Sequence, residues 1–237
     1  MDINSTEWRK LLQRLAVSAD IHLEDETFGL LGKFAAELLA WNEKTNLTAI
    51  TEPAEVAEKH ILDSLIPGSF IQSLLPVEEL SLLDIGSGGG FPGIPLKIFM
   101  PHLRVTMVDS VRKKVNFLKY VIRTLQLDGI DAIHARIEDL TRQKDFAGHF
   151  DVVISRAFTA LDRFLILGAP FLKPGGVIIA MKGKEVRKEL DAMEAKAAGP
   201  SIYKIGDFQL TLHLENYTLP ESGGQRSLVI GRKGDGS

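Results

Sequence analysis

A run of glycines follows a short apolar segment: Gly86, Gly88, Gly89 and Gly90 lie two to six residues after Asp84. Glycine adopts positive φ without a Cβ penalty and lets a ligand approach the backbone closely. A helical pattern follows the run, so it is typical of a turn at the carboxyl edge of a sheet, where α/β proteins bind their ligands. The pattern predicts a site for a nucleotide-like molecule, although a tight loop without a ligand uses the same residue types.

An acidic residue ends the next predicted strand. Asp109 lies 19 residues after Gly90, the position from which nucleotide-binding folds hydrogen-bond ribose hydroxyls. A dinucleotide fingerprint would place its last glycine at position 91, where this chain has Phe91. The loop instead reads D-x-G-x-G-x-G from Asp84, and an acidic group near the loop suits the charged amino-acid end of S-adenosylmethionine. It therefore favours S-adenosylmethionine, and a nicotinamide-dependent oxidoreductase is the weaker alternative.

Residues after the third predicted strand suit the adenine end of such a ligand. An apolar side chain at Ile137 would pack on the ring, and a polar group at Glu138 or Asp139 would meet its amino group. Acidic residues also favour the first turn of a solvent-exposed helix, so a helix cap is the structural alternative.

The residue types after the fourth predicted strand restrict the methyl acceptor. The chain has no cysteine, which excludes the covalent attack used by cytosine-C5 transferases. Residues 155–158 read S-R-A-F, where amino-methylating enzymes commonly carry an Asp/Asn-Pro-Pro-Tyr/Phe element. A ring nitrogen with an in-plane lone pair, such as guanine N7, needs only placement and electrostatic help. Arg156 could bond the O6/N7 edge of guanine, the cofactor or a phosphate, or it could form a structural ion pair.

Basic residues are concentrated in a few segments, mainly after the second and fifth predicted strands, although the net charge of the chain is −3. Several would lie at the rim of the predicted site and suit a phosphate backbone, while exposed helix faces are the alternative interpretation. Trp41 and Phe158 could stack on a base, although Trp41 is more typical of a core residue. His60 could act in catalysis, although a histidine at such a position is more often a hydrogen-bonded structural residue of a helix. The basic residues are Arg112, Lys113, Lys114, Lys119, Arg123, Lys182, Lys184, Arg187, Lys188 and Arg226.

Periodicity divides the chain into a helical part and an alternating part. Apolar spacing predicts helices in residues 1–75, with a break near residues 46–48 and a new helix from residue 53, because proline suits a first helical turn. Strands are predicted over residues 80–85, 104–109, 130–136, 150–155 and 177–181, with helices over 92–99, 111–127, 161–172 and 185–198. Residues 203–214 and 227–232 read as two final strands, antiparallel because their connection is too short for a crossover helix. Repeated strand–helix–strand units predict a doubly wound sheet.

The composition is that of an ordinary soluble protein, with 237 residues, 45% of them hydrophobic and 25% charged. The first residues are polar and lack the apolar core of a signal peptide, and no apolar run approaches the roughly 18 residues of a membrane span. We therefore expect a cytoplasmic protein without a membrane association and without a metal site.

Several segments together resemble the RsmG (GidB) family of bacterial 16S rRNA guanine-N7 methyltransferases. The resemblance covers roughly residues 38–185 and is looser beyond. One departure is Gly89, where other members often carry proline, and we expect no effect on binding. The matching segments are Trp41–Asn42, Asn46–Thr48, His60–Ser64, Asp84–Gly93 with Ile94–Leu96, Asp109–Ser110, Lys113–Lys114 with Phe117–Leu118, Arg136 with Glu138, Ser155–Ala157 and Lys182–Gly183.

The resemblance implies a class I S-adenosylmethionine-dependent methyltransferase fold with a helical N-terminal extension (residues 1–75, followed by a methyltransferase domain over 76–237). It implies methyl transfer to N7 of one guanine in the decoding region of 16S rRNA. We expect a monomer that acts on 16S rRNA, either free or within the 30S subunit or its precursor. Arg156 and Arg136 are the candidate catalytic residues. The candidate cofactor-binding residues are Gly86, Gly88, Phe91, Asp109, Ser110, Ile137, Glu138 and Arg156, and the candidate RNA-binding residues are Lys113, Lys182, Arg226, Asn46 and His60.

Two other functions remain open from the residues alone. The same fold could methylate a protein or a small molecule, in which case substrate binding would depend little on salt. It could also be an RNA-binding module without cofactor affinity. We further expect that Arg156→Ala impairs turnover more than folding.

Overall fold

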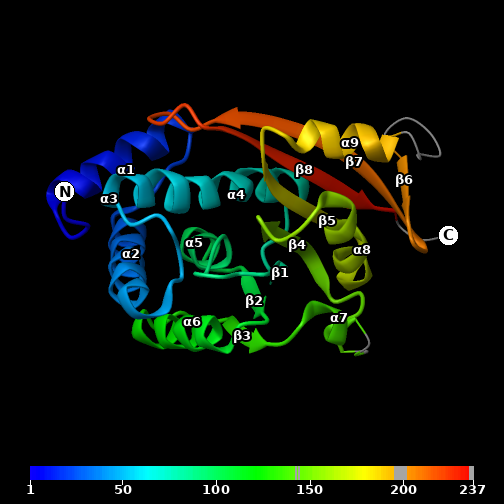
Figure 1. The fold of residues 1–237 in the computed structure, drawn as a ribbon, viewed down its shortest axis with the longest axis horizontal. Helices are drawn as coiled ribbons and strands as arrows, with labels where there is room; N and C mark the ends of the chain where they lie inside the picture. Colours follow the sequence, from blue (N-terminus) through cyan, green and yellow to red (C-terminus); the bar gives the residue numbers. More distant parts are fainter. Residues whose placement is uncertain (142, 144, 195–201, 235–237) are drawn as a thin grey trace.

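The computed structural model describes the whole chain apart from residues 142, 144, 195–201 and 235–237 (Figure 1). One eight-stranded sheet runs through the described residues in the order β3-β2-β1-β4-β5-β8-β7-β6. Its strands are β1 (Ser81–Ile85), β2 (Arg104–Asp109), β3 (Ile130–His134), β4 (Phe150–Arg156), β5 (Leu172–Gly183), β6 (Ile202–Ile205), β7 (Phe208–Thr218) and β8 (Gln225–Lys233).

The direction of the strands agrees with the expected doubly wound sheet. Strands β1 to β5 pair in parallel, whereas β8 pairs antiparallel with β5 and with β7. The chain order reverses at β1, with β2 on one side and β4 on the other. A ligand crevice is expected at this point, outside the carboxyl ends of the strands.

Helices cover both faces of the parallel strands, which explains the apolar runs in their sequences. Successive residues of a strand point to opposite faces, so Leu82 belongs to one hydrophobic cluster and Leu83 to the other. The helices that follow the strands are α5 (Gly93–Phe99), α6 (Arg112–Thr124), α7 (Ile137–Leu140), α8 (Leu161–Gly168) with a 3₁₀ turn (Ala169–Phe171), and α9 (Val186–Glu194).

The N-terminal region is helical, as predicted, and shares a core with the sheet. It contains α1 (Thr6–Ser18), α2 (Asp25–Thr45) and a continuous helical run of α3 (Pro53–Glu55), a π-helical segment η1 (Val56–Leu62) and α4 (Asp63–Leu74). Trp41 of α2 packs on Phe117 and Tyr120 of α6, with ring centroids 5.5 and 5.0 Å apart. Trp41 is therefore a packing residue. Figure 1 shows α1, α2 and α4 around one side of the sheet.

The C-terminal strands differ from the prediction in one respect. The single strand expected over residues 203–214 is wrong, because β6 and β7 form a hairpin in which Ile205 pairs with Phe208. Gly206, with φ +59°, and Asp207 form the two-residue turn. A glycine at positive φ is the ordinary signal of such a turn. The end of the helix expected over 185–198 lies outside the described residues.

No helix within the described part of the chain is long and apolar enough to cross a membrane.

Candidate cofactor and substrate site

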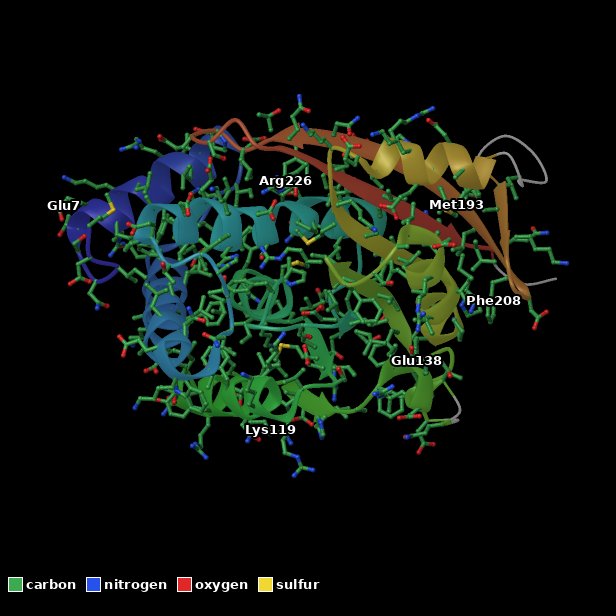
Figure 2. All side chains as sticks on the ribbon, in the orientation of Figure 1. Glu7, Lys119, Glu138, Met193, Phe208 and Arg226 are labelled. Carbon is green, nitrogen blue, oxygen red and sulfur yellow. The ribbon has the colours of Figure 1, made fainter. Side chains whose placement is uncertain are left out.

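A cleft of about 450 Å³ lies at the carboxyl ends of β1, β2 and β4. Its size is within the range of small-molecule sites, and it occupies the position where the strand order reverses. In Figure 2, Glu138 marks its side near α7. The lining residues are Ile85, Gly86, Val108, Asp109, Ser110, Val111, Lys114, Ala135, Arg136, Ile137, Glu138, Ala157, Phe158, Thr159 and Arg163.

Asp109 connects the glycine loop to the turn after β2. Its Oδ2 accepts a hydrogen bond from the Gly88 backbone N–H at 2.9 Å, and its Oδ1 accepts one from the Val111 N–H at 2.8 Å. The side chain is largely buried but lines the cleft. A carboxylate has about four lone-pair positions, so Asp109 can also accept hydrogen bonds from two neighbouring hydroxyls of a ligand. Gly88 contributes by fixing this carboxylate, not by lining the cleft.

The glycine loop requires glycine for two separate reasons. Gly86 and Gly90 have φ of +73° and +94°, a region that other residues rarely adopt. A Cβ atom at Gly86 would also lie 2.6 Å from Cδ2 of Phe158, the aromatic residue that follows β4. Gly86 therefore allows the β1 and β4 turns to approach each other at the floor of the cleft.

Gly86→Ala is expected to weaken cofactor binding by about tenfold or more, because the new methyl group must displace Phe158 or change the loop. Calorimetric titration with S-adenosylmethionine checks this. Gly183→Ala is a matched control, since a Cβ at Gly183 meets nothing within 4 Å. Equal affinities of the Gly86 variant and the wild type would show that this approach of the two turns is unimportant.

Asp84 lies beneath the loop and is fully buried. Its Oδ2 accepts a hydrogen bond from the Gly93 N–H at 3.0 Å, while Oδ1 has no partner among the described residues. Burial raises the pKa of Asp84 from 3.8 to about 7, against the smaller opposing effects of the Gly93 and Ser87 hydrogen bonds and of Arg156. The carboxyl group is thus poised between its neutral and charged forms near neutral pH.

This raised pKa predicts a pH dependence of stability. Between about pH 4 and pH 7 the folded protein holds a proton on Asp84 that the unfolded chain releases, so the contribution to stability is full below pH 4 and decreases as pH rises to 7. Asp84→Asn removes this dependence. The melting temperature of the Asp84→Asn variant minus that of the wild type should therefore be larger at pH 8 than at pH 5, as measured by differential scanning calorimetry. A pH-independent difference between the two proteins would contradict the prediction.

The opposite wall of the cleft carries the residues expected at the adenine end. Ile137 is buried, and Arg136 and Glu138 lie at the opening. Glu138 pairs with Arg163 of α8 at 3.0 Å. A hydrogen bond from its own backbone N–H, followed by the Arg163 contact, holds the pKa of Glu138 below its usual value. The pair is exposed, so it can open for a ligand at little energetic cost.

Arg156, expected to touch the cofactor and the acceptor, lies behind the cleft and does not line it. One Nη donates to the Lys59 carbonyl at 2.9 Å and the other to Nδ1 of His60 at 3.1 Å. Asp63 lies 3.6 Å from the guanidinium. The Arg156 side chain is 18% exposed, so most of its surface faces protein. It connects β4 to the π-helical segment of the N-terminal extension.

His60 and Phe91 belong to the same cluster. Their rings stack with centroids 4.4 Å apart, and the Arg156 guanidinium carbon lies 4.7 Å from the Phe91 centroid. Burial, followed by the nearby Arg156, lowers the pKa of His60 to about 3, so His60 is neutral. Because its Nδ1 accepts from Arg156, its Nε2 carries the hydrogen and donates to Thr48 Oγ1 at 2.7 Å. His60 and Phe91 are buried and lie outside the cleft lining.

The remaining candidates for RNA contact are dispersed. Lys113 is exposed on α6, and Asn46 is the left-handed C-cap of α2 with φ +50°. The ammonium group of Lys182 is already bound by the Thr159 carbonyl and by Glu189. Arg226 lies 3.8 Å from Asp63 with its side chain 30% exposed. Asn46 and Lys182 thus have evident structural roles, whereas Lys113 and Arg226 are accessible.

The cleft lining includes residues that were not predicted to bind the cofactor, among them Lys114, Phe158, Thr159 and Arg163. Lys114 and Phe158 are predicted only as candidate RNA contacts, and Thr159 and Arg163 are not predicted at all. The available signal is the position of residues 157–159 directly after β4, at the same sheet edge as the glycine loop. Ala157 has φ +53°, which turns the chain back toward Gly86.

The fold and the cleft define a class I methyltransferase architecture. An O-methyltransferase from Bacillus cereus, solved in complex with SAH, superimposes with a TM-score of 0.62 at 16% identity, over 96% of this chain and 98% of that one. A putative O-methyltransferase from Klebsiella pneumoniae gives 0.60 at 14% identity, covering 96% of this chain and 98% of the other. These similarities concern the fold alone.

The sequence comparisons identify the family. The family model described as rRNA small subunit methyltransferase G (GidB) matches residues 28–205. A ribosomal RNA small subunit methyltransferase G from Geobacter sp. (strain M21) is 41% identical over 94% of this chain and 96% of that protein. One from Streptococcus pneumoniae (strain 70585) is 38% identical over 87% of this chain and 86% of that protein. The chain belongs to this family, which confirms the family, the fold class and the methyltransferase activity predicted from the sequence.

Proposed function

We propose that this protein transfers the methyl group of S-adenosylmethionine to N7 of a guanine in the decoding region of 16S rRNA. The observation that carries the proposal is the cleft at the β1–β2–β4 edge, with Asp109 fixed by the Gly88 N–H in a chain of this family. The target is RNA of the small ribosomal subunit or its precursor, and we further propose a monomeric, cytoplasmic enzyme without a membrane association.

The residues present fit this cofactor. The Asp109 carboxylate suits the ribose hydroxyls, and the buried Ile137 with Glu138 suits an adenine ring and its amino group. The backbone of Gly86 is free of a side chain where the amino-acid portion would lie. Asp84 lies beneath the loop, and its Oδ1 has no hydrogen-bond partner within the described part of the chain. When ionised, its carboxylate attracts a positive charge placed nearby. When bound, the cofactor supplies an electrophilic methyl group on a sulfonium.

Transfer to N7 makes limited demands on the protein. The acceptor nitrogen has a lone pair and carries no hydrogen, so no general base is required. The protein must exclude water and hold the base so that N7 is in line with the methyl group and the sulfur of the cofactor. Phe158, 36% exposed at the cleft and packed on Gly86, is placed to stack on a base.

The two proposed catalytic arginines have different surroundings. Arg136 is exposed at the cleft opening and can reach a bound ligand. Arg156 is held by Lys59, His60 and Asp63, so we assign it a positioning role. Through its contact with Phe91 and its place at the end of β4, it would fix the glycine loop and the Phe158 turn relative to each other.

Transfer of labelled methyl groups from S-adenosylmethionine to 16S rRNA tests the proposal. The rRNA should come from a strain that lacks the family enzyme, with naked rRNA and 30S particles assayed in parallel. Incorporation into 16S rRNA supports the proposal. Labelling of protein or small molecules instead would favour the alternative substrate classes, and tight RNA binding without cofactor binding would indicate a non-catalytic module.

A further inference from the structure

A second hollow, separate from the cofactor cleft, lies where the loop after β5 approaches the ends of β7 and β8. It has a volume of about 420 Å³, and none of the described residues lines both this hollow and the cofactor cleft. In Figure 2, Arg226 marks this region in the upper part of the molecule, away from Glu138 at the cofactor cleft. Its lining includes Lys184, Arg187, Asn216, Thr218, Gln225 and Arg226.

The lining carries three cations, Lys184, Arg187 and Arg226, and includes no Asp or Glu from the part of the chain that the structure describes, although the chain as a whole has a net charge of −3. Lys184 is exposed and has no ion-pair partner among the described residues. Arg187 pairs with Asp191 at 2.9 Å, but both side chains are more than half exposed, so the pair is weak and can be exchanged for another anion. The hollow therefore presents a concentrated positive charge.

Neutral hydrogen-bond donors accompany these cations. Ser227 Oγ donates to Oδ1 of Asn216 at 2.8 Å, which fixes the amide and leaves its Nδ2 group as a donor. Thr218 and Gln225 line the same hollow and are exposed. Cations combined with amide and hydroxyl groups are the set that proteins use for phosphate and sugar contacts along a nucleic-acid backbone.

The hollow is preformed by buried contacts from the N-terminal extension. Asp63 accepts a hydrogen bond from the Tyr217 hydroxyl at 2.7 Å and lies 3.8 Å from Nε of Arg226. Glu58 of the π-helical segment accepts hydrogen bonds from the backbone N–H groups of Glu221 and Ser222, in the turn between β7 and β8. These contacts hold the turn and Arg226 in place before a ligand binds, which reduces the entropic cost of binding.

The position of the hollow relates it to the reaction. Gly183 at the end of β5 pairs with Arg226, and Arg226 pairs with Tyr217, so the hollow opens at the carboxyl edge of the parallel strands. The cofactor cleft opens at this edge too. Three strand spacings separate β1 from β8 in the sheet, a distance of about 14 Å. At this separation, the base that enters the cofactor cleft cannot also occupy the hollow, whereas the nucleotides that flank this base can reach it.

We propose that this hollow binds backbone phosphates of the substrate RNA next to the methylated nucleotide, with Lys184, Arg187 and Arg226 as the phosphate-binding residues. The inference rests on the proposed RNA substrate. It adds a second contact region, so that the RNA is held at two places along one sheet edge while the target base enters the cofactor cleft.

Filter binding of deproteinised 16S rRNA over a range of KCl concentrations tests the hollow directly. Lys184→Ala combined with Arg187→Ala should weaken binding by about tenfold or more and reduce the slope of log Kd against log salt concentration by about 2, one for each phosphate-binding cation that is removed. Lys33→Ala, an exposed cation on α2, is the control. The Kd for S-adenosylmethionine should be the same in all of these proteins.

The inference would be overturned if the double variant had the same RNA affinity and salt slope as the Lys33 variant, or if the wild type did not bind RNA. Pyrophosphate binding is measured in parallel as a probe for a free anion. If the double variant lost pyrophosphate binding while its RNA binding was unchanged, the hollow would be a site for a free anion, and the inference would also be overturned. Methyl transfer by the wild type is assayed separately. RNA binding that depends on Lys184 and Arg187, without methyl transfer, would support the hollow and refute the proposed function.

Discussion

Arg156→Ala is expected to lower the free energy of unfolding by about 3–5 kcal/mol, because it leaves the Asp63 carboxylate buried without its guanidinium neighbour. It also removes the donors to the Lys59 carbonyl and to His60 Nδ1. Urea unfolding at pH 7 measures the change. From the sequence alone, Arg156→Ala was expected to impair turnover more than folding. The structure revises this expectation, because it shows that Arg156 is buried, which the neighbouring residues in the sequence do not reveal.

A double variant separates the role of the charge from that of the packing. Burial raises the pKa of Asp63, and Arg156 is the largest influence that opposes this rise. Asp63→Asn in the Arg156→Ala background should therefore recover part of the lost stability. At a temperature where Arg156→Ala is folded, we expect methyl transfer to fall by at least about tenfold while S-adenosylmethionine still binds. A destabilisation below about 1 kcal/mol would refute the role assigned to Arg156.

Asp109→Ala is expected to weaken S-adenosylmethionine binding by about 100-fold. The variant leaves the N–H groups of Gly88 and Val111 without their acceptor and removes the proposed contact to the ribose, for a combined loss of about 3 kcal/mol. Calorimetric titration measures the affinity. Asp131→Ala is a matched control on the neighbouring strand, since Asp131 is exposed and, among the described residues, accepts a hydrogen bond only from the next residue, Ala132. An Asp109 variant that binds within about twofold of the wild type would exclude this aspartate from the cofactor site.

The sequence predicted the features that local patterns encode. Apolar runs ended by Asp109 or followed by Gly86 indicate buried parallel strands, and the order of strands and helices defines which edge carries the site. For this reason Gly86, Asp109, Ile137 and Glu138 were expected together, Ser110 was added through the family resemblance, and all five line one cleft.

Contacts between distant segments were not predictable in the same way. Arg156 meets His60, 96 residues earlier, only because the π-helical segment η1 presents His60 and the Lys59 carbonyl to the end of β4. Apolar periodicity distinguishes helix from strand, but it does not reveal a π-helical turn or its partner. The segment containing His60 and Asp63 was recognised only through the family resemblance. The structure shows the role of these two residues, because both contact Arg156.

The hairpin of β6 and β7 shows a second limit of sequence patterns. Residues 203–214 contain enough apolar residues to read as one strand, although Gly206 and Asp207 form a turn. A single glycine in a strand pattern is compatible with a bulge as well as a turn, so the choice depends on which strand is available to pair.

Nucleoside analysis of the methylated RNA tests the central claim most directly. 16S rRNA from a strain that lacks the family enzyme is incubated with the protein and S-adenosylmethionine, digested to nucleosides and examined by mass spectrometry against N7-methylguanosine. We predict one N7-methylguanosine per rRNA molecule, located in the decoding region and absent with the Asp109→Ala variant. Absence of N7-methylguanosine from rRNA treated with protein that binds the cofactor, or methylation at another atom, would contradict the account.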